Sequence, residues 1–368
     1  MERSIYAQII KVFLIFVLNI QIVSTLYSQE VINYKGININ VEQVSFKGFD
    51  GINLKGLIFT PQNKSNLPAI IVNHGFGGTK DSFCSKAYTK GYEGSHMPVA
   101  EELAKAGFIV LAYDQRGTGE SEGDLELTDR IKDVENAIAF IKKYPQVNTN
   151  MIGLFGHSLG SYIGAVAGAI YKDIKAVTLW STPTSIDYLL KETLNSNNQN
   201  LTSALYDGMI VSSNFVEPVI QNPSIMIDQR VSNVLGDLGL SFSLTADSKN
   251  INIGGAHTFG IGASDKGAYI IIGSLRSSVY NLMRTVIDSE ELNPQLYIDK
   301  ISPRPLLLIH GMDDPLIPFS SSELLYTLAG DPKKLILIEN TDHMYRKPEN
   351  KVDTVIELTV SWFKDNLK

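Results

Sequence analysis

The chain has 368 residues, 44% hydrophobic and 9% aromatic, enough to bury a sizeable core in one large domain or two ordinary ones. Its formal net charge is −7 without a block of like charge, which argues against a nucleic-acid-binding protein, whose surface would be basic. Cys84 is the single cysteine, so no disulfide within the chain is possible. Histidine and cysteine show no zinc-site spacing, and we expect neither a metal nor another cofactor.

The first residues differ from the rest of the chain. Basic residues precede a mostly apolar run at 12–23, which has the length of a signal-peptide core and is short for a membrane span. Small residues follow, and we place a cleavage site near Ser28 and Gln29. The sequence therefore predicts a signal peptide at 1–28 and a mature chain that is secreted or periplasmic. An uncleaved anchor is the alternative, because the cleavage site is not a clean Ala-x-Ala, and it would be the only membrane contact.

Segments typical of strands then alternate with segments typical of helices. Two half-buried strands come first, at 41–48 and 52–59, with an Asp50-Gly51 turn between them. Apolar runs predict further strands at 67–73, 108–114, 151–156, 174–180, 305–309 and 334–338. Apolar residues at helical spacing predict helices at 97–106, 129–144, after residue 158, and at 320–328 and 352–367. This alternation indicates an α/β protein with a mainly parallel sheet covered on both faces, and with sites at the carboxyl ends of its strands.

A Gly-x-Ser-x-Gly turn around Ser158 organises the chemistry. It follows a short buried strand and precedes a helix, an arrangement that holds a serine hydroxyl in the open on a strained corner. A Cβ at Gly156 or Gly160 would collide with the neighbouring strand and helix. The helix carries Gly160, Gly164 and Gly168 at four-residue spacing, a stripe that would let it lie close on a sheet.

A serine nucleophile needs a histidine to take its proton and a carboxylate to hold that histidine. His343 follows the last predicted strand, in a loop from which a base could reach back over the sheet, whereas His157 is expected to face elsewhere. Asp313 and Asp314 follow another strand and compete as the acid. We favour Asp314, with Asp313 as an exposed turn residue. Asp342 is a third choice, because neighbouring loop residues usually point apart.

The oxyanion that develops on the substrate needs two preorganised donors. One is expected to be the backbone N–H of Leu159, the residue after the serine. The other is expected from the loop at 74–78, and we assign it to the backbone N–H of Phe76. A tight turn without a catalytic role is the alternative for this loop.

Three features occur together: the order Ser158, Asp314, His343; the loop at 74–78, here called the glycine loop; and the Gly-x-Ser-x-Gly turn, here called the serine turn. In combination they resemble the α/β-hydrolase superfamily over about residues 41–182 and 297–368. The resemblance implies an α/β-hydrolase fold, with nucleophile Ser158, acid Asp314, base His343 and oxyanion donors at the positions just named. The stretch His-Gly-x-x-Asp-x-x-x-Pro that ends in Pro318 matches the family's usual surroundings of the acid, so Asp314 outranks its neighbour.

The loop at 114–123 is similar to that of X-Pro dipeptidyl-peptidase-like, cocaine-esterase-like and feruloyl-esterase-like members. We expect its Asp114 and Arg116 to tie it beneath the oxyanion hole. At about 183–293 the rhythm of strands and helices breaks, where family members often carry a cap over the active site. The expected organisation is a signal peptide at 1–28, a hydrolase core at 29–183 and 297–368, and a cap at 184–296.

The family resemblance implies a serine hydrolase that cleaves a carboxylic ester through an acyl-enzyme, without a cofactor and with a small molecule as its partner. A serine peptidase of the X-Pro dipeptidyl-peptidase or aminopeptidase type is the alternative. It would need a cap carboxylate to hold the substrate's amine, and the segment offers Asp187, Glu192, Asp207, Glu217 and Asp228. A dinucleotide-binding oxidoreductase is disfavoured, because no glycine loop reads Gly-x-Gly-x-x-Gly. A non-catalytic binding protein on the same scaffold would leave the intact triad unexplained.

Overall fold

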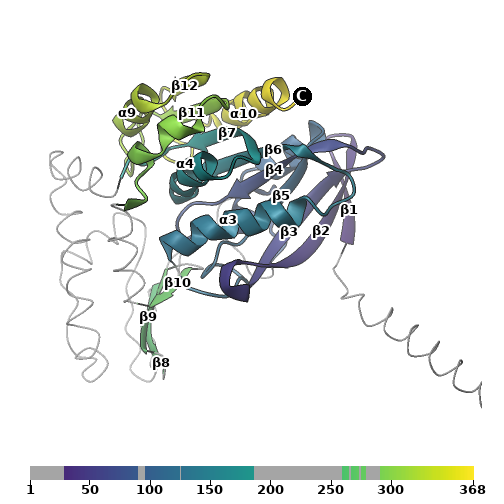
Figure 1. Ribbon diagram of the computed structural model, residues 1–368, viewed down its shortest axis with the longest axis horizontal. Coiled ribbons are helices and arrows are strands. Elements are labelled where there is room, and N and C mark those ends of the chain that lie inside the picture. The colour runs from purple at the N-terminus through teal and green to yellow at the C-terminus, as the bar shows by residue number, and fades with distance from the viewer. Residues whose placement is uncertain are drawn as a thin grey trace, which may run out of the picture.

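A computed structural model describes residues 29–89, 96–124, 126–185, 259–264, 267–272, 275–278 and 291–368 (Figure 1). The signal peptide expected at 1–28 lies outside these residues, as does most of the cap expected at 184–296. None of the helices in the described ranges is long and apolar enough to cross a membrane.

A nine-stranded open sheet forms the centre of the molecule (Figure 1). Its strands are β1 (Gln29–Tyr34), β2 (Ile37–Lys47), β3 (Asn53–Pro61), β4 (Leu67–Asn73), β5 (Ile109–Tyr113), β6 (Val147–His157), β7 (Ile174–Trp180), β11 (Leu306–Gly311) and β12 (Lys333–Ile338). Their order is β1-β2-β3-β5-β4-β6-β7-β11-β12. The pairs from β1 to β5 are antiparallel and those from β5 to β12 are parallel, as the alternation of strands and helices predicted.

Helices cover both faces of this sheet. They are α2 (Val99–Lys105), α3 (Leu127–Ile141), α4 (Leu159–Ile170), α9 (Ser320–Leu328) and α10 (Val352–Asn366). Apolar residues of α3, α4 and α9 share one core with the sheet, and those of α2 and α10 share another on the opposite face. Within β4, the fully buried Ile70 and Ile71 belong to opposite cores, which explains why this strand reads as a continuous apolar run.

Short 3₁₀ helices occupy several connections: η1 (Phe49–Gly51), η2 (Lys80–Phe83), η3 (Pro294–Leu296) and η4 (Ile298–Ile301). A separate antiparallel sheet is formed by β8 (Phe259–Ser264), β9 (Gly267–Ile272) and β10 (Leu275–Ser278). This sheet lies within the segment whose topology the sequence left unassigned.

Two tight turns shape the antiparallel end of the main sheet. Asp50 and Gly51 both have positive φ, 61° and 84°, as expected for the turn predicted between β2 and β3. The sequence missed β1, which pairs with β2 through Lys35 and Gly36. These two residues also have positive φ, 48° and 85°, the requirement of a two-residue hairpin turn whose twist matches its strands.

The glycine stripe of α4 faces the sheet, as its spacing predicted. A Cβ built on Gly164 would lie 2.9 Å from Leu179 Cδ2, and one on Gly168 would lie 3.1 Å from Val177 Cγ2. Both neighbours belong to β7, so α4 lies close enough to that strand to hold Ser158, at its N-terminus, against the carboxyl edge of the sheet.

Candidate active site

Ser158 lies on a sharp turn between β6 and α4. Its φ of 54° and ψ of −124° place it in a region that a residue with a Cβ occupies at a cost in strain. The Ser158 backbone N–H donates to the Trp180 carbonyl at 3.0 Å, and its carbonyl accepts from the Ser161 N–H at 2.9 Å. Hydrogen bonds to β7 and to the first turn of α4 therefore hold the strained conformation in place.

Two glycines make this turn possible. A Cβ on Gly156 would lie 2.3 Å from the Gly160 carbonyl oxygen, and one on Gly160 would lie 2.2 Å from that of Asn73. Both contacts are with backbone, which cannot swing away as a side chain can. The collisions expected from the sequence are thus present, and they bring α4 directly against the end of β4.

Asp314 and His343 meet above the carboxyl ends of neighbouring strands. Asp314 follows β11, His343 follows β12, and the Asp314 Oδ2 atom lies 2.6 Å from His343 Nδ1. The Asp314 Oδ1 atom accepts from the backbone N–H groups of Leu316 and Ile317, each at 2.9 Å. Burial raises the pKa of Asp314, but hydrogen bonds from His310 and His343 outweigh it and hold that pKa well below its usual range. The carboxyl group is therefore ionised and fixed in orientation.

Asp313 and Asp342, the two other candidate acids, have different surroundings. Asp313 is exposed, whereas Asp314 is buried. The Asp342 carboxylate accepts from the backbone N–H groups of Met344 and Arg346, so it braces its own loop. Of the three carboxylates weighed from the sequence, the structure brings Asp314 to His343.

His157 links the serine turn to the loop of His343. Its Nε2–H donates to the His343 carbonyl at 2.9 Å, and the two rings lie with their centroids 4.7 Å apart. Burial lowers the pKa of His157 to about 3, so the ring is neutral and this nitrogen donates. His157 was expected to face elsewhere. It instead packs against His343, and because His157 immediately precedes Ser158, the loop of His343 is held beside the serine.

The glycine loop after β4 passes next to the serine. A Cβ on Gly75 would lie 3.1 Å from Ser158 Cβ. The Phe76 side chain is 47% exposed, as a residue at the open side of the loop would be. Leu159 is the first residue of α4, so its N–H has no partner within the helix. The two segments expected to supply oxyanion donors therefore meet at Ser158.

Comparisons with known proteins agree with the fold. A family model described as X-Pro dipeptidyl-peptidase (S15 family) matches residues 50–208, and one described as the prolyl oligopeptidase family matches 280–368. The crystal structure of the α/β hydrolase GrgF from Penicillium sp. sh18 superposes with a TM-score of 0.58 at 18% identity, over 89% of this chain and 99% of that one.

The chain has the α/β-hydrolase fold. Est1E of Butyrivibrio proteoclasticus, solved with ferulic acid bound, shares the fold with a TM-score of 0.54 at 19% identity, over 88% of this chain and 98% of that one. The polyketide transferase ATR5 of Stachybotrys chlorohalonatus is 23% identical over 312 residues, 82% of this chain and 90% of the relative. The two family models both describe hydrolase families, which supports this chain being an enzyme of the hydrolase class.

Gln115 and Arg130 hold the glycine loop of this hydrolase in place through a chain of hydrogen bonds. The Gln115 N–H donates to His74 Nε2 at 3.1 Å, and its side-chain amide donates to the His74 carbonyl at 2.6 Å. Arg130 Nη1 in turn donates to Gln115 Oε1 at 2.9 Å. Burial lowers the pKa of His74 to about 3, so its neutral Nε2 can accept.

Neither Gln115 nor Arg130 was predicted from the sequence to have a role at the site. A signal was present for Arg130, because it lies three residues after Leu127 and four before Val134, on the buried face of α3. A cation on the apolar face of a predicted helix needs a partner, and could have been paired with the loop at 114–123.

Asp114 and Arg116 have different roles from each other. Asp114 Oδ1 accepts from the backbone N–H of Lys80 at 2.7 Å and its Oδ2 from Lys80 Nζ at 3.0 Å, which ties the loop to η2, just after the glycine loop, as expected. Arg116 was expected to do the same and does not. It binds Asp129 at 3.0 Å and Asp133 at 2.7 Å, because these two carboxylates of α3 attract the guanidinium and offset the cost of its burial.

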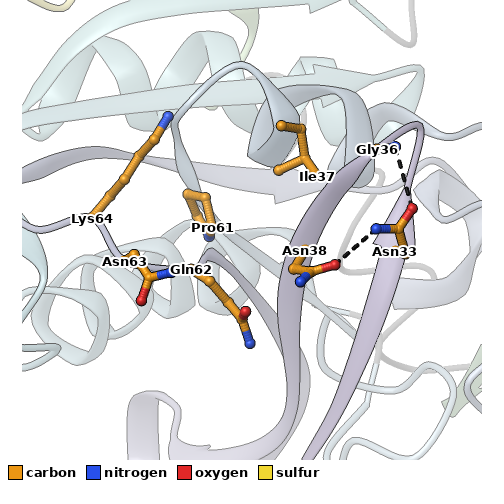
Figure 2. A pocket seen from close by; sticks show the side chains of 8 residues that line it. All are labelled: Asn33, Gly36, Ile37, Asn38, Pro61, Gln62, Asn63 and Lys64. Atoms are coloured by element: carbon orange, nitrogen blue, oxygen red, sulfur yellow. Dashed lines mark hydrogen bonds between the residues drawn. The ribbon is translucent and has the colours of Figure 1, made fainter.

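A surface pocket lies away from the candidate catalytic residues (Figure 2). It is lined by the β1–β2 turn, with Asn33 and Ile37, and by Pro61 to Lys64, which lead into the amino end of β4. Ser158 lies at the opposite, carboxyl edge of the sheet, so this pocket is not part of the candidate site. In the ranges the structure describes, no group of three or more His, Cys, Asp or Glu residues is placed to hold a metal ion.

Proposed function

We propose that this α/β hydrolase is a serine hydrolase that cleaves a carboxylic ester through an acyl-enzyme, with Ser158 as nucleophile, His343 as base and Asp314 as acid. The observation that carries the proposal is the 2.6 Å contact between Asp314 Oδ2 and His343 Nδ1, beside a serine on a strained turn. Because Nδ1 donates to the carboxylate, Nε2 of a neutral His343 is free to accept the proton of Ser158.

Two steps complete the reaction. Ser158 Oγ attacks the acyl carbon while its proton passes to His343 Nε2; the ester C–O bond then breaks, and the alcohol leaves with that proton. Water next attacks the acyl-enzyme, giving its proton to His343, and the carboxylic acid leaves as Ser158 recovers its proton. Asp314 stabilises the imidazolium in both steps and stays ionised.

The negative charge that develops on the acyl oxygen is proposed to be bound by the backbone N–H groups of Phe76 and Leu159. The first lies on the loop that Gln115 and Lys80 anchor, and the second opens α4, whose N-terminus favours negative charge. Donors fixed before the reaction need no reorganisation when the charge appears.

A serine peptidase of the X-Pro dipeptidyl-peptidase or aminopeptidase type, using the same three residues, is the second candidate. The X-Pro dipeptidyl-peptidase model that matches 50–208 favours it. The esterases among the solved structures of this fold favour ester cleavage. The five cap carboxylates that could hold a substrate amine lie outside the described residues.

The two candidates separate in a substrate panel. Purified protein would be assayed with p-nitrophenyl esters of increasing acyl length and with Xaa-Pro p-nitroanilides, each in parallel with Ser158→Ala. An esterase turns over the esters with kcat/KM far above that for the anilides. Efficient cleavage of Xaa-Pro anilides, lost in the variant, would instead establish the peptidase.

We also propose that residues 1–28 direct the enzyme out of the cytoplasm and that residues 184–296 form a cap over a small-molecule substrate. The support is the basic and apolar pattern of the first segment and the position of the second between two parts of the core. N-terminal sequencing of the protein from cell fractions tests the first proposal: a mature chain that begins near Gln29 is expected, and an intact Met1 in the cytoplasm would overturn it.

A further inference from the structure

Asp314 contacts a second histidine besides His343. His310, in β11, is fully buried, and its Nε2 lies 3.2 Å from Asp314 Oδ2, the same oxygen that receives His343 Nδ1 at 2.6 Å. On its other side, His310 Nδ1 lies 2.6 Å from the hydroxyl of Ser322 in α9. One carboxylate oxygen is thus shared between two imidazoles.

The proton on His310 can be placed from its partners. Nε2 lies 2.9 Å from the Ile317 carbonyl as well as close to the Asp314 carboxylate, and both of these groups only accept hydrogen bonds. Nε2 therefore carries a hydrogen and donates. The Ser322 hydroxyl is able to donate to Nδ1, an arrangement that keeps the hydrogen on Nε2.

We propose that His310 is a positioning residue of the catalytic site, which orients the Asp314 carboxylate and competes with His343 for the charge on Oδ2. The inference rests on the proposed serine mechanism. A hydrogen bond donated to a carboxylate spreads its negative charge, so less of that charge is left to stabilise the imidazolium of His343. His310 thereby keeps His343 a weaker base than an unshared Asp314 would make it.

The titratable groups that face Asp314 and its two histidines from the neighbouring elements do not add a charge to them. His157, from the end of β6, and Tyr345, from the loop after β12, lie nearest. Burial lowers the pKa of His157 to about 3 and raises that of Tyr345 well above its usual range, so both are neutral near pH 7. The charge that His310 and His343 share is therefore that of Asp314.

The test compares His310→Leu, which removes the donor, with His310→Gln, whose side-chain amide can replace Nε2–H. The pH dependence of the second-order rate constant for labelling of Ser158 by a fluorophosphonate reports the titration of His343 without knowledge of the natural substrate. Hydrolysis of p-nitrophenyl acetate, followed over the same pH range, is the second readout.

We expect the acid limb of the labelling profile to move upward by about half a pH unit or more in His310→Leu, because the loss of one hydrogen bond to a charged group is worth at least that much. The plateau rate should fall about tenfold as the carboxylate loses its fixed orientation, an effect expected of supporting residues. His310→Gln should restore both. An acid limb that stays at the wild-type pH in folded His310→Leu would overturn the inference.

Alanine substitutions of Ser322 and Ser321 provide a less disruptive pair of variants in case His310→Leu fails to fold. Ser321 and Ser322 are both fully buried, but Ser321 Oγ has no hydrogen-bond partner among the described residues. Ser322→Ala should shift the acid limb of the labelling profile in the same upward direction, while Ser321→Ala leaves it in place. Identical profiles for the two alanine variants would contradict the proposal.

The outcomes separate this inference from the function on which it rests. NMR titration of the His343 Cε1–H signal, assigned with His343→Gln, follows the base without any turnover. Wild-type protein whose Ser158 resists the label would overturn the serine mechanism, and this inference with it. Normal labelling of the wild type, with a His343 titration unmoved by His310→Leu, would overturn the inference alone.

Discussion

Gln115 and His74 are joined by two hydrogen bonds, in both of which Gln115 donates. Its backbone N–H reaches the His74 imidazole at 3.1 Å, and its side-chain amide reaches the His74 carbonyl at 2.6 Å. The loop after β5 thus holds both the side chain and the backbone of the residue that begins the glycine loop. Since that loop is proposed to carry an oxyanion donor, the donor's position depends on Gln115, a buried residue.

Replacing Gln115 should therefore impair catalysis more than binding. Gln115→Met removes the side-chain donor and keeps the shape, and we expect kcat for an ester to fall about tenfold or more, below the 10²–10³ typical of losing a whole oxyanion donor. Gln62→Met is the matched control, because that glutamine donates to Asn40 on the opposite edge of the sheet. Steady-state kinetics check this, and an unchanged kcat in folded Gln115→Met would contradict it.

The two neutral buried histidines predict how stability depends on pH. His74 and His157 have folded-state pKa values lowered to about 3, against about 6.5 in an unfolded chain. The unfolded state binds more protons below pH 6.5, so the free energy of unfolding should decrease as pH falls, by about 1.2 kcal/mol per histidine between pH 7 and 5.5.

Urea unfolding at several pH values measures this slope. His157→Gln keeps a donor for the His343 carbonyl but cannot titrate, so its slope should be smaller by the share of one histidine. Equal slopes in the two proteins, or a stability that increases toward pH 5.5, would show that His157 is not held neutral.

Substitutions of the neighbouring residues Asp313 and Asp314 should have very different effects on kcat. Asp314→Asn removes the charge that holds His343, and kcat should fall by about 10³- to 10⁴-fold, as in other triads that lose the carboxylate. Asp313→Asn changes an exposed side chain and should leave kcat near that of the wild type. Ester hydrolysis by the two purified variants checks this, and equal losses would remove Asp314 from its proposed role.

Two glycines of α4 should respond differently to the same change. In Gly160→Ala the new Cβ would meet the Asn73 carbonyl at 2.2 Å, a backbone atom that cannot move alone, so we expect a loss of about 3 kcal/mol or more and a displaced serine turn. In Gly164→Ala the new Cβ meets the end of the Leu179 side chain at 2.9 Å, and alanine favours the helix by about 1 kcal/mol. Thermal unfolding compares them, and equal stabilities would contradict the packing described here.

Much of the fold followed from local patterns in the sequence. Continuous apolar runs predicted β4, β5 and β11 because both faces of these strands are buried, and the glycine stripe predicted the close packing of α4. β1 was missed because an exposed edge strand carries little apolar signal; its residues are mostly exposed or half-buried.

The polar contacts of the site were harder to predict. Asp314 and His343 could be proposed because each follows a strand of the same parallel sheet. The partners of His310, Gln115 and Arg130 could not, since they depend on which buried groups tertiary packing brings within hydrogen-bond distance. Arg116 was assigned wrongly for the same reason: its spacing in the loop does not reveal that two aspartates of α3 face it.

The proposed mechanism depends above all on Ser158 acting as the nucleophile. The most direct measurement is the turnover of a p-nitrophenyl ester by wild-type protein and by folded Ser158→Ala. We predict a loss of about 10⁴-fold or more in kcat for the variant. Equal rates in the two proteins would contradict the mechanism proposed here.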